Sequence, residues 1–343
     1  MKVAPPAALA CLIPLLLAFQ LIASPPLVVA RTVYLMGTRT TLTVRASGRD
    51  GALQQLEHMV RSLEQTETEL STWRSDSVLS ALNRHPVGEG VVVSAPVCRL
   101  WPELTAWHRE TRGAFDPAVG ALIDVWGLRG AGRMPSPMQL LAARALTGWA
   151  HFDFDAVDCL VTRAVDVTID AGAFGKGAAL RRLQQDYGGA DPWLVDLGGQ
   201  VAVSDRSNAW PVAIAHPRRR GLAALEIRLA GGSLATSGGS ERSHVVEGQV
   251  VGHILDPRSG RPVNRLGSVT VWHPDPLAAD VLSTALYVLG PKAGLRYAET
   301  NGLAALFLTP TAASGIVGFA TRSSQVFRQR FPTVENADIP SGF

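Results

Sequence analysis

The chain has 343 residues, of which 47% are hydrophobic and 18% are charged, a composition typical of a globular protein and not of a disordered one. Its formal net charge is only +3 at pH 7, and its Lys and Arg residues form no cluster interleaved with aromatic side chains. These features argue against nucleic acid as a partner.

Residues 1–30 have the features of an export signal. Lys2 precedes an apolar run from Ala7 to Ile22, and the small residues Val28-Val29-Ala30 precede Arg31. We expect cleavage after Ala30. The apolar run is short for a spanning helix, and an uncleaved membrane anchor is the alternative. Both interpretations predict an exported protein, either periplasmic or anchored on the outer side of the inner membrane.

Two cysteines, Cys98 and Cys159, follow the predicted signal. They could pair in an oxidising compartment. Two scattered cysteines form no framework, however, and the sequence leaves their pairing open.

In the first half of the chain, Thr32–Val44 alternates well enough for one strand with a kink at Met36-Gly37-Thr38. Apolar residues at helical spacing predict helices over residues 53–63, 97–107 and 138–146. Ser77 or Asp76 is placed to cap a short helix after the polar loop that carries Trp73. Because burial of a large aromatic in a polar loop needs a reason, Trp73 is a candidate for stacking on a planar ring.

In the second half, Val165–Ile169 alternates as a strand and runs into a glycine-rich turn. Further strands are predicted over residues 193–197, 210–215, 222–229, 269–272 and 303–308, with helices around Leu180–Leu183 and over 277–289 and 292–300. Hairpin-like strand clusters mixed with helices favour an α+β fold over a doubly wound parallel sheet. We expect one compact domain of one or two lobes over residues 31–330, followed by a tail at 331–343.

The stretch Ser233–Val263 contains a candidate general base. After the strand-like Leu234-Ala235, Thr236–Ser240 is predicted as a hydroxyl- and glycine-rich turn that lets backbone N–H groups approach an anion. A second apolar run, Val250–Leu255, follows a Glu247-Gly248 turn, and we expect the two runs to form a hairpin. His253 then lies at a strand end beside a tight polar turn, where a base is usefully placed. The alternative is that His253 only ties the turn down.

The stretch Asp170–Gly177 predicts a strand, a glycine-rich turn, a lysine and a helix. It is not a P-loop, because Gly177 stands where that motif needs Ser or Thr, and the chain lacks the dinucleotide fingerprint G-x-G-x-x-G. The geometry still aims N–H groups and Lys176 at an anion such as a pyrophosphate. An ordinary turn with a solvated lysine is the alternative.

Asp280 and Thr284 stand four residues apart on a predicted helix, so both oxygens project from one face. Mg²⁺ is commonly held by one or two carboxylates together with substrate phosphates. The alternative is that Asp280 only favours the positive end of the helix dipole. No His/Cys cluster has zinc spacing.

These motifs together resemble the ApbE family of FAD:protein FMN transferases. The resemblance extends from Met36 to about Gly290 through blocks in the family's order. The blocks are Met36-Gly37-Thr38; Ser71–Arg74 with Ser77 and Asn83; Ala114–Pro117 with Trp126-Gly127; Asp170–Gly177; Leu197–Gly199; Thr236–Gly238; His253–Pro262; Ser268–Val271; and Asp280 with Thr284–Leu286. Asp196, Gln200 and Gly239-Ser240 depart from the family's usual residues, which puts details of the cofactor contacts in question.

The resemblance implies an enzyme that binds FAD and Mg²⁺, transfers FMN through a phosphoester bond to a Thr or Ser hydroxyl of an acceptor flavoprotein, and releases AMP. The implied acceptor is an exported or membrane redox subunit. By the same resemblance His253 is the catalytic base, Asp256 orients it, and Lys176 holds a phosphate oxygen. The implied metal ligands are Asp280, Thr284 and the backbone carbonyl of Ala173. The implied FAD site is lined by Met36, Trp73, Ala114, Phe115, Asp116, Asp170, Lys176 and Ile254.

Two other functions remain open at this point. An FAD pyrophosphatase would use water instead of a protein hydroxyl and release FMN and AMP. A periplasmic FAD carrier or electron-transfer flavoprotein would leave Asp280 and Thr284 without a purpose.

Overall fold

The computed structural model describes residues 27–204, 209–218, 221–239, 243–264, 267–311 and 318–332, and the backbone of 335–336. The predicted export signal therefore lies outside the described residues except for residues 27–30, which belong to the first strand. Within the described ranges, no helix is both long and apolar enough to cross a membrane. The export signal, its cleavage site and the C-terminal tail stay predictions.

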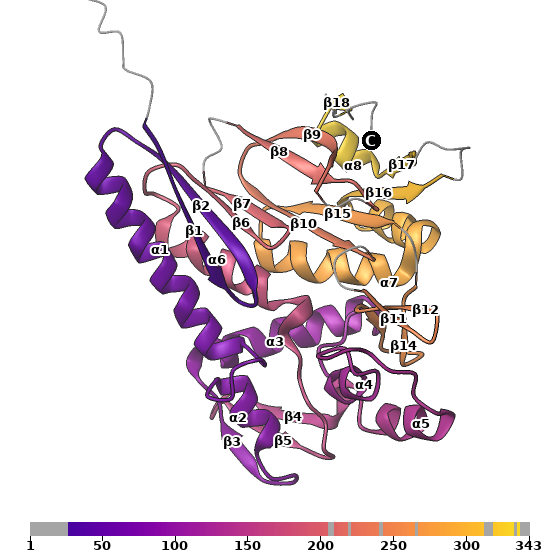
Figure 1. Ribbon diagram of the computed structural model, residues 1–343. Helices are drawn as coiled ribbons and strands as arrows, with labels where there is room; N and C mark the ends of the chain where they lie inside the picture. Colours follow the sequence, from indigo (N-terminus) through magenta and orange to yellow (C-terminus); the bar gives the residue numbers. More distant parts are fainter. Residues whose placement is uncertain are drawn as a thin grey trace, which may run out of the picture.

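An eight-stranded antiparallel sheet forms the centre of the molecule (Figure 1). Its order is β1 (Leu27–Leu35), β2 (Thr38–Ala46), β6 (Trp193–Leu197), β7 (Gln200–Val203), β10 (Gly232–Gly238), β15 (Ser268–His273), β16 (Ala304–Pro310) and β17 (Phe319–Ser323). Apolar side chains on both faces of these strands are buried. Leu42 and Val195 face one layer of covering elements, and Val203 and Leu234 face another. A sheet covered on both sides needs apolar residues on both faces, which is why β10 and β15 do not alternate cleanly.

Three helices cover one face of the sheet. They are α1 (Arg49–Leu70), α6 (Gly175–Tyr187) and α7 (Pro276–Thr300). The buried stripe of α1, including Leu56 and Leu63, packs against β1, β2 and α6. Gly290 has a φ of +77° and precedes Pro291, and together they kink α7. The kink separates the two helices that the sequence predicts over residues 277–289 and 292–300.

A short β-ribbon covers the opposite face. Figure 1 shows β8 (Trp210–Ala215), β9 (Ala223–Leu229), β18 (Glu335–Asn336) and α8 (Gln325–Arg330) on the other side of the sheet from α7. Ile214 of β8 and Ile227 of β9 pack with Leu234 of β10 and Leu306 of β16. The ribbon therefore closes the second half of the core.

A smaller lobe lies at the α7 side of the sheet, with its own three-stranded sheet β3–β5–β4. It contains α2 (Val78–Arg84), β3 (Gly90–Val92), α3 (Ala95–Glu110), α4 (Gly120–Val125), α5 (Pro137–Ala145), β4 (Phe152–Asp155), β5 (Leu160–Arg163), the 3₁₀ turns η1 (Trp149–His151) and η2 (Ala171–Ala173), and the ribbons β11 (Ser243–Val246)–β12 (Gln249–Gly252) and β13 (Leu255–Asp256)–β14 (Arg261–Pro262). Ser77 caps α2 by accepting the Ser80 N–H at 3.1 Å, as predicted.

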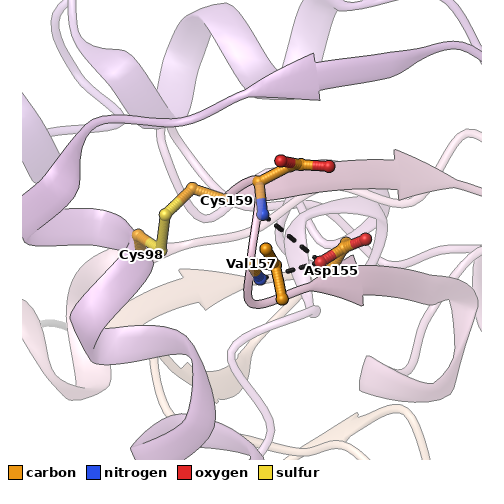
Figure 2. Close-up of a disulfide and its surroundings, with 5 residues drawn as sticks. Cys98, Asp155, Val157 and Cys159 are labelled. Carbon is orange, nitrogen blue, oxygen red and sulfur yellow. Dashed lines mark hydrogen bonds between the residues drawn. A yellow bond between two sulfur atoms is a disulfide. The ribbon is translucent and has the colours of Figure 1, made fainter.

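Cys98 and Cys159 form a disulfide, which answers the question that their spacing left open. Cys98 lies on α3 and Cys159 at the turn between β4 and β5, as Figure 2 shows. The same turn is held by the Asp155 carboxylate, which accepts the N–H of Val157 at 2.8 Å and that of Asp158 at 3.3 Å. The disulfide thus joins the helix and the small sheet of the lobe.

The α+β, single-domain prediction is confirmed, and three local predictions are wrong. Residues 32–44 are not one kinked strand but the β1–β2 hairpin, because Met36 and Gly37 both have positive φ, at 50° and 70°, and reverse the chain. Val165–Ile169 has no ladder partner within the described ranges. The Asn83 side chain takes the place of a neighbouring strand. Its Oδ1 accepts the Ile169 N–H and its Nδ2 donates to the Ile169 carbonyl, both at 2.8 Å.

The third correction concerns the stretch around His253. The Glu247-Gly248 turn exists, but it joins β11 to β12, and Leu234-Ala235 takes no part in that hairpin. Thr236, Ser237 and Gly238 form no turn. They continue β10, which pairs with β15 in the main sheet. The hydroxyls of Thr236 and Ser237 therefore project from a strand held by its neighbours.

Candidate active site

Two adjoining cavities lie where the N-terminus of α6, the first turns of α7, the end of β10 and the segment around His253 meet. The first has a volume of about 190 Å³ and the second about 180 Å³. Both are lined by Trp73, Gly172, Lys176 and His253. A ligand with two ring systems could place one in each cavity and its linker at the shared wall.

The structure brings the sequence-predicted residues together at these cavities. The first cavity is lined by Trp73, Ala114, Phe115, Asp116, Asp170, Ala173, Lys176, His253, Ile254, Asp280 and Thr284. Met36 lines the second. Asp256 differs from the others, since it is absent from the residues described as lining either cavity.

Asp280 is the buried charge of the site, with only 3% of its surface exposed. Its Oδ2 accepts the backbone N–H of Gly177 at 2.9 Å, and its Oδ1 lies 3.3 Å from the Lys176 ammonium. A buried carboxylate needs such partners to remain charged. The position therefore combines a fixed negative charge with a cation that faces the cavity.

Gly177 makes this arrangement possible. A Cβ at this position would lie 2.6 Å from the carbonyl oxygen of Pro276 and 2.7 Å from the Asp280 Cβ. Only a residue without a side chain lets the first turn of α6 approach α7 this closely. The glycine that rules out a P-loop is thus required by packing.

A cluster of hydroxyl groups extends the oxygen-rich wall. The Ser237 Oγ of β10 lies 2.9 Å from the Ser283 Oγ and 3.4 Å from the Thr284 Oγ1 of α7. Asp280 and Thr284 are one helical turn apart and both line the cavity, as their spacing predicted.

The oxygen atoms at this wall are chemically suited to bind Mg²⁺. A carboxylate, a hydroxyl and a nearby backbone carbonyl are oxygen ligands of the type that this ion prefers. Within the described ranges, no group of three or more His, Cys, Asp or Glu side chains could hold a metal by itself.

A second ion pair lies across the cavity. Asp170 accepts a hydrogen bond from the Thr72 hydroxyl at 3.0 Å and from the Arg129 guanidinium at 2.8 Å. Arg129 also donates to the Thr72 carbonyl at 3.0 Å, and its guanidinium carbon is 5.5 Å from the centroid of the Trp73 ring. Trp73 is 61% exposed and lines both cavities, so its ring is accessible to a ligand there.

Asp116 is a buried anchor beneath the first cavity. Its two oxygens accept the backbone N–H groups of Ala118 at 2.8 Å and Trp149 at 3.1 Å, and the His108 ring is 3.4 Å away. Burial raises the pKa of the Asp116 carboxyl above its usual value, against the lowering effect of these N–H groups and of His108. Asp116 thus shapes the cavity by holding two segments of the lobe.

His253 lies on the wall between the two cavities, as expected for a base that acts on a bound linker. Asp256 is engaged elsewhere, with its carboxylate accepting from the Arg258 Nε and Nη2, both at 2.8 Å. Burial would raise the pKa of Asp256, but these hydrogen bonds outweigh it and hold the pKa below its usual value. The predicted orienting role of Asp256 thus stays a prediction.

Sequence reasoning missed Arg129 and the role of the Ser237 side chain. Arg129 lies in the Pro/Gly-rich excursion after Trp126 and carries no motif of its own. An available signal was an unpaired Asp170 that needs a cationic partner once it is partly buried. The composition around Ser237 predicts a turn, in which its hydroxyl would have no fixed direction.

Known proteins resemble this chain over most of its length. The family model described as the ApbE family matches residues 36–307. The FAD:protein FMN transferase of Vibrio cholerae is 31% identical over 278 residues, which cover 78% of this chain and 82% of that protein, and that of Haemophilus influenzae is 29% identical over 299 residues, covering 81% and 84%. Among solved structures, the apo flavinyl transferase ApbE of Pseudomonas stutzeri superposes with a TM-score of 0.77 at 32% identity, covering 91% of this chain and 99% of that one. The ApbE protein of Thermotoga maritima gives 0.79 at 28% identity, covering 88% and 99%.

Proposed function

This chain belongs to the ApbE family and is an FAD:protein FMN transferase, and we propose that it uses Mg²⁺ to transfer FMN to a Thr or Ser hydroxyl of an exported acceptor protein, with release of AMP. The observation that carries this proposal is the wall shared by the two cavities. Lys176 and His253 lie on it, and Asp280 and Thr284 line the first cavity beside it. In FAD, a pyrophosphate joins the flavin and adenosine halves, so the pyrophosphate would lie where these groups meet.

The reaction breaks and forms one phosphorus–oxygen bond. The acceptor oxygen loses its proton and bonds to the phosphorus of the FMN half, and the bond between this phosphorus and the bridging oxygen breaks. AMP leaves with that oxygen. In such transfers the protein contributes positioning and charge stabilisation.

His253 would take the proton from the acceptor hydroxyl. Its ring lies on the wall between the cavities, within the same site as the Lys176 ammonium. A histidine is suited to this step because its ordinary pKa lies close to neutral pH. Lys176 would stabilise negative charge on the phosphate oxygens, since its pairing with Asp280 holds it at the cavity.

Asp280, Thr284 and the Ala173 carbonyl would hold Mg²⁺, which supplies charge neutralisation at the pyrophosphate when bound. The Oδ1 of Asp280 already forms a salt bridge with the Lys176 ammonium. The position therefore attracts positive charge. The Ser237 hydroxyl, 3.4 Å from Thr284, limits the directions in which the Thr284 oxygen can turn.

Trp73 and Arg129 would hold one of the two ring systems. The exposed Trp73 face offers stacking, and the Arg129–Asp170 pair beside it offers polar contacts to a ring edge. Ala114, Phe115 and Ile254 add apolar lining to the same cavity.

Export is supported by the Cys98–Cys159 disulfide, because such bonds persist in oxidising compartments. The acceptor would accordingly be an exported or membrane-bound redox subunit. Membrane association through the N-terminal segment is part of this proposal.

The test mixes the purified protein with FAD, Mg²⁺ and a purified exported redox domain that has one candidate threonine. Flavin fluorescence on the domain after denaturing electrophoresis, lost on chelation of Mg²⁺ and in the His253→Ala variant, is the expected result. Free FMN and AMP without a fluorescent band would favour the pyrophosphatase. Bound FAD without either product would favour a carrier.

A further inference from the structure

A third cavity, of about 660 Å³, lies on the other face of the main sheet from α7, between the sheet and the β8–β9 ribbon. Thr236 lines both this cavity and the first one, and Thr38 and Gly198 line both this cavity and the second one. The three cavities therefore meet around the ends of β2, β6 and β10. The third cavity therefore borders the proposed reaction site.

The end of β10 has an open edge at this junction. Gly232–Ala235 pairs with β7, but β7 begins at Gln200, directly after the tight Gly198-Gly199 turn. On its other side β10 continues to pair with β15 through Gly238. Among the strands that the structure describes, none pairs with Thr236–Gly238 on the β7 side.

The backbone direction at this edge follows from one hydrogen bond. The Gly239 N–H donates to the Gly267 carbonyl on the β15 side at 3.3 Å. Because residues of a strand direct their N–H and C=O groups alternately to the two sides, Thr236 and Gly238 direct theirs to the β7 side. The register with β7 places Gly199 of the tight turn opposite Thr236, so the open position on this side is that of Gly238. An unpaired strand edge of this kind is a template for another strand.

Ser268 provides an independent sign of a missing partner. Ser268 is buried, with 8% of its surface exposed, and it lines the third cavity beside Gly238. Its hydroxyl has no hydrogen-bond partner within the described part of the chain. A buried hydroxyl without a partner costs free energy, which a hydrogen bond to a polar group that reaches it would recover.

We propose that the acceptor polypeptide, on the premise of the proposed transferase function, binds as an extended strand along Thr236–Gly238 and enters through the third cavity. Its main chain pairs with the backbone of Gly238, in the mode by which peptides extend an exposed sheet edge. The acceptor is thus recognised first as an extended main-chain segment, and Ser268 adds one polar contact.

The register of this added strand selects the reactive residue. Residues directly opposite each other on neighbouring strands project to the same face. Ser237 projects toward α7, where its hydroxyl lies 3.4 Å from the Thr284 Oγ1. An acceptor Thr or Ser opposite Ser237 therefore points into the reaction site, and its two neighbours point into the third cavity.

The test compares two substitutions on β2. Thr41 lines the third cavity, whereas Thr43 lies two residues further along on the same face of the strand and is outside the lining residues described. With the acceptor domain of the transfer assay, we expect Thr41→Trp to raise the acceptor KM at least about tenfold and to leave the Kd for FAD unchanged. Thr43→Trp should change neither. Thermal unfolding of both variants controls for folding.

Ser268→Ala and hydrogen exchange give independent readouts. Ser268→Ala should raise the acceptor KM by about two- to tenfold, the range of one neutral hydrogen bond, without lowering the melting temperature. The amide of Gly238 should exchange more slowly when the acceptor is added to the FAD-loaded protein.

The outcomes separate this inference from the function on which it rests. If the wild-type protein flavinylates the domain but Thr41→Trp behaves as Thr43→Trp and the Gly238 amide gains no protection, the acceptor binds elsewhere. If the wild-type protein transfers no flavin to the domain, the proposed Mg²⁺-dependent transfer to an exported Thr or Ser acceptor is overturned, and the acceptor site with it.

Discussion

Replacing Asp280 with Asn tests the metal site while preserving the shape of the side chain. The carboxylate is buried at the start of α7 and interacts with Lys176 and Gly177 of α6. The amide keeps one oxygen that can accept the Gly177 N–H, but it removes the negative charge. The substitution therefore separates the charge of Asp280 from its packing.

Two magnitudes follow from these contacts. The Gly177 contact changes from a charge-assisted to a neutral hydrogen bond, and the difference between these classes is about 1 kcal/mol of unfolding free energy. The Lys176 side chain is 28% exposed, so its ammonium is solvated when it loses its partner. Loss of this ion pair therefore adds little to the change in unfolding free energy. The effect on catalysis is larger, since loss of one group that stabilises charge in the transition state typically costs about 10²–10³-fold in rate.

The assay measures the rate of flavin transfer as a function of Mg²⁺ concentration, by fluorescence of the acceptor band. We expect Asp280→Asn to lower the rate at saturating Mg²⁺ about 10²–10³-fold and to shift the concentration dependence to higher Mg²⁺. The matched control is Asp275→Asn on the same helix. Asp275 caps α7 and pairs with Arg181 of α6, but it lies outside the residues described as lining the cavities.

Asp275→Asn should retain the wild-type rate and Mg²⁺ dependence, because Asn caps helices as well as Asp does. A stability effect alone would appear in both variants. If Asp280→Asn kept the wild-type rate and Mg²⁺ dependence, the assignment of Asp280 to the metal would be refuted.

Three further predictions concern the fold. Gly177→Ala should lower the unfolding free energy by about 1–3 kcal/mol in urea titrations, because its Cβ would lie 2.6 Å from a backbone oxygen of α7; Gly51→Ala, with nothing within 4 Å of the new Cβ, should be neutral or stabilising. Burial lowers the pKa of His273 below its usual value, so the unfolded chain binds the proton more tightly and stability should decline as pH falls below about 6.5 toward the folded pKa; a His273→Gln variant with the same pH dependence of melting temperature would contradict this. Replacing both Cys98 and Cys159 with Ser should lower the unfolding free energy by about 4 kcal/mol, since the disulfide closes a loop with a sequence separation of 61. A reductant should lower the melting temperature of the wild-type protein but not that of this variant.

Several features of this protein follow from local sequence. The cap at Ser77, the helices α1, α3 and α7, and the common face of Asp280 and Thr284 depend on neighbours within a few residues. Spacing along a helix is fixed by its own backbone, so a four-residue interval predicts one face wherever the helix packs.

The tertiary structure alone decided the contacts between distant segments. Thr236–Gly238 has the composition of a turn but lies in β10, because β15 supplies the ladder partners. Ile169 continues an alternating run, yet its backbone hydrogen bonds go to the Asn83 side chain, 86 residues earlier. In both cases the partner that satisfies the backbone is far away in sequence.

The same division applies to the site. The sequence by itself identified Lys176, Asp170 and His253 as candidates, through their turns and through the family resemblance. It did not indicate that Arg129 pairs with Asp170, that Cys98 reaches Cys159, or that β10 ends with an open edge. A residue's own periodicity reports which face it occupies, whereas the charge, sulfur or strand that it meets depends on how separate segments pack.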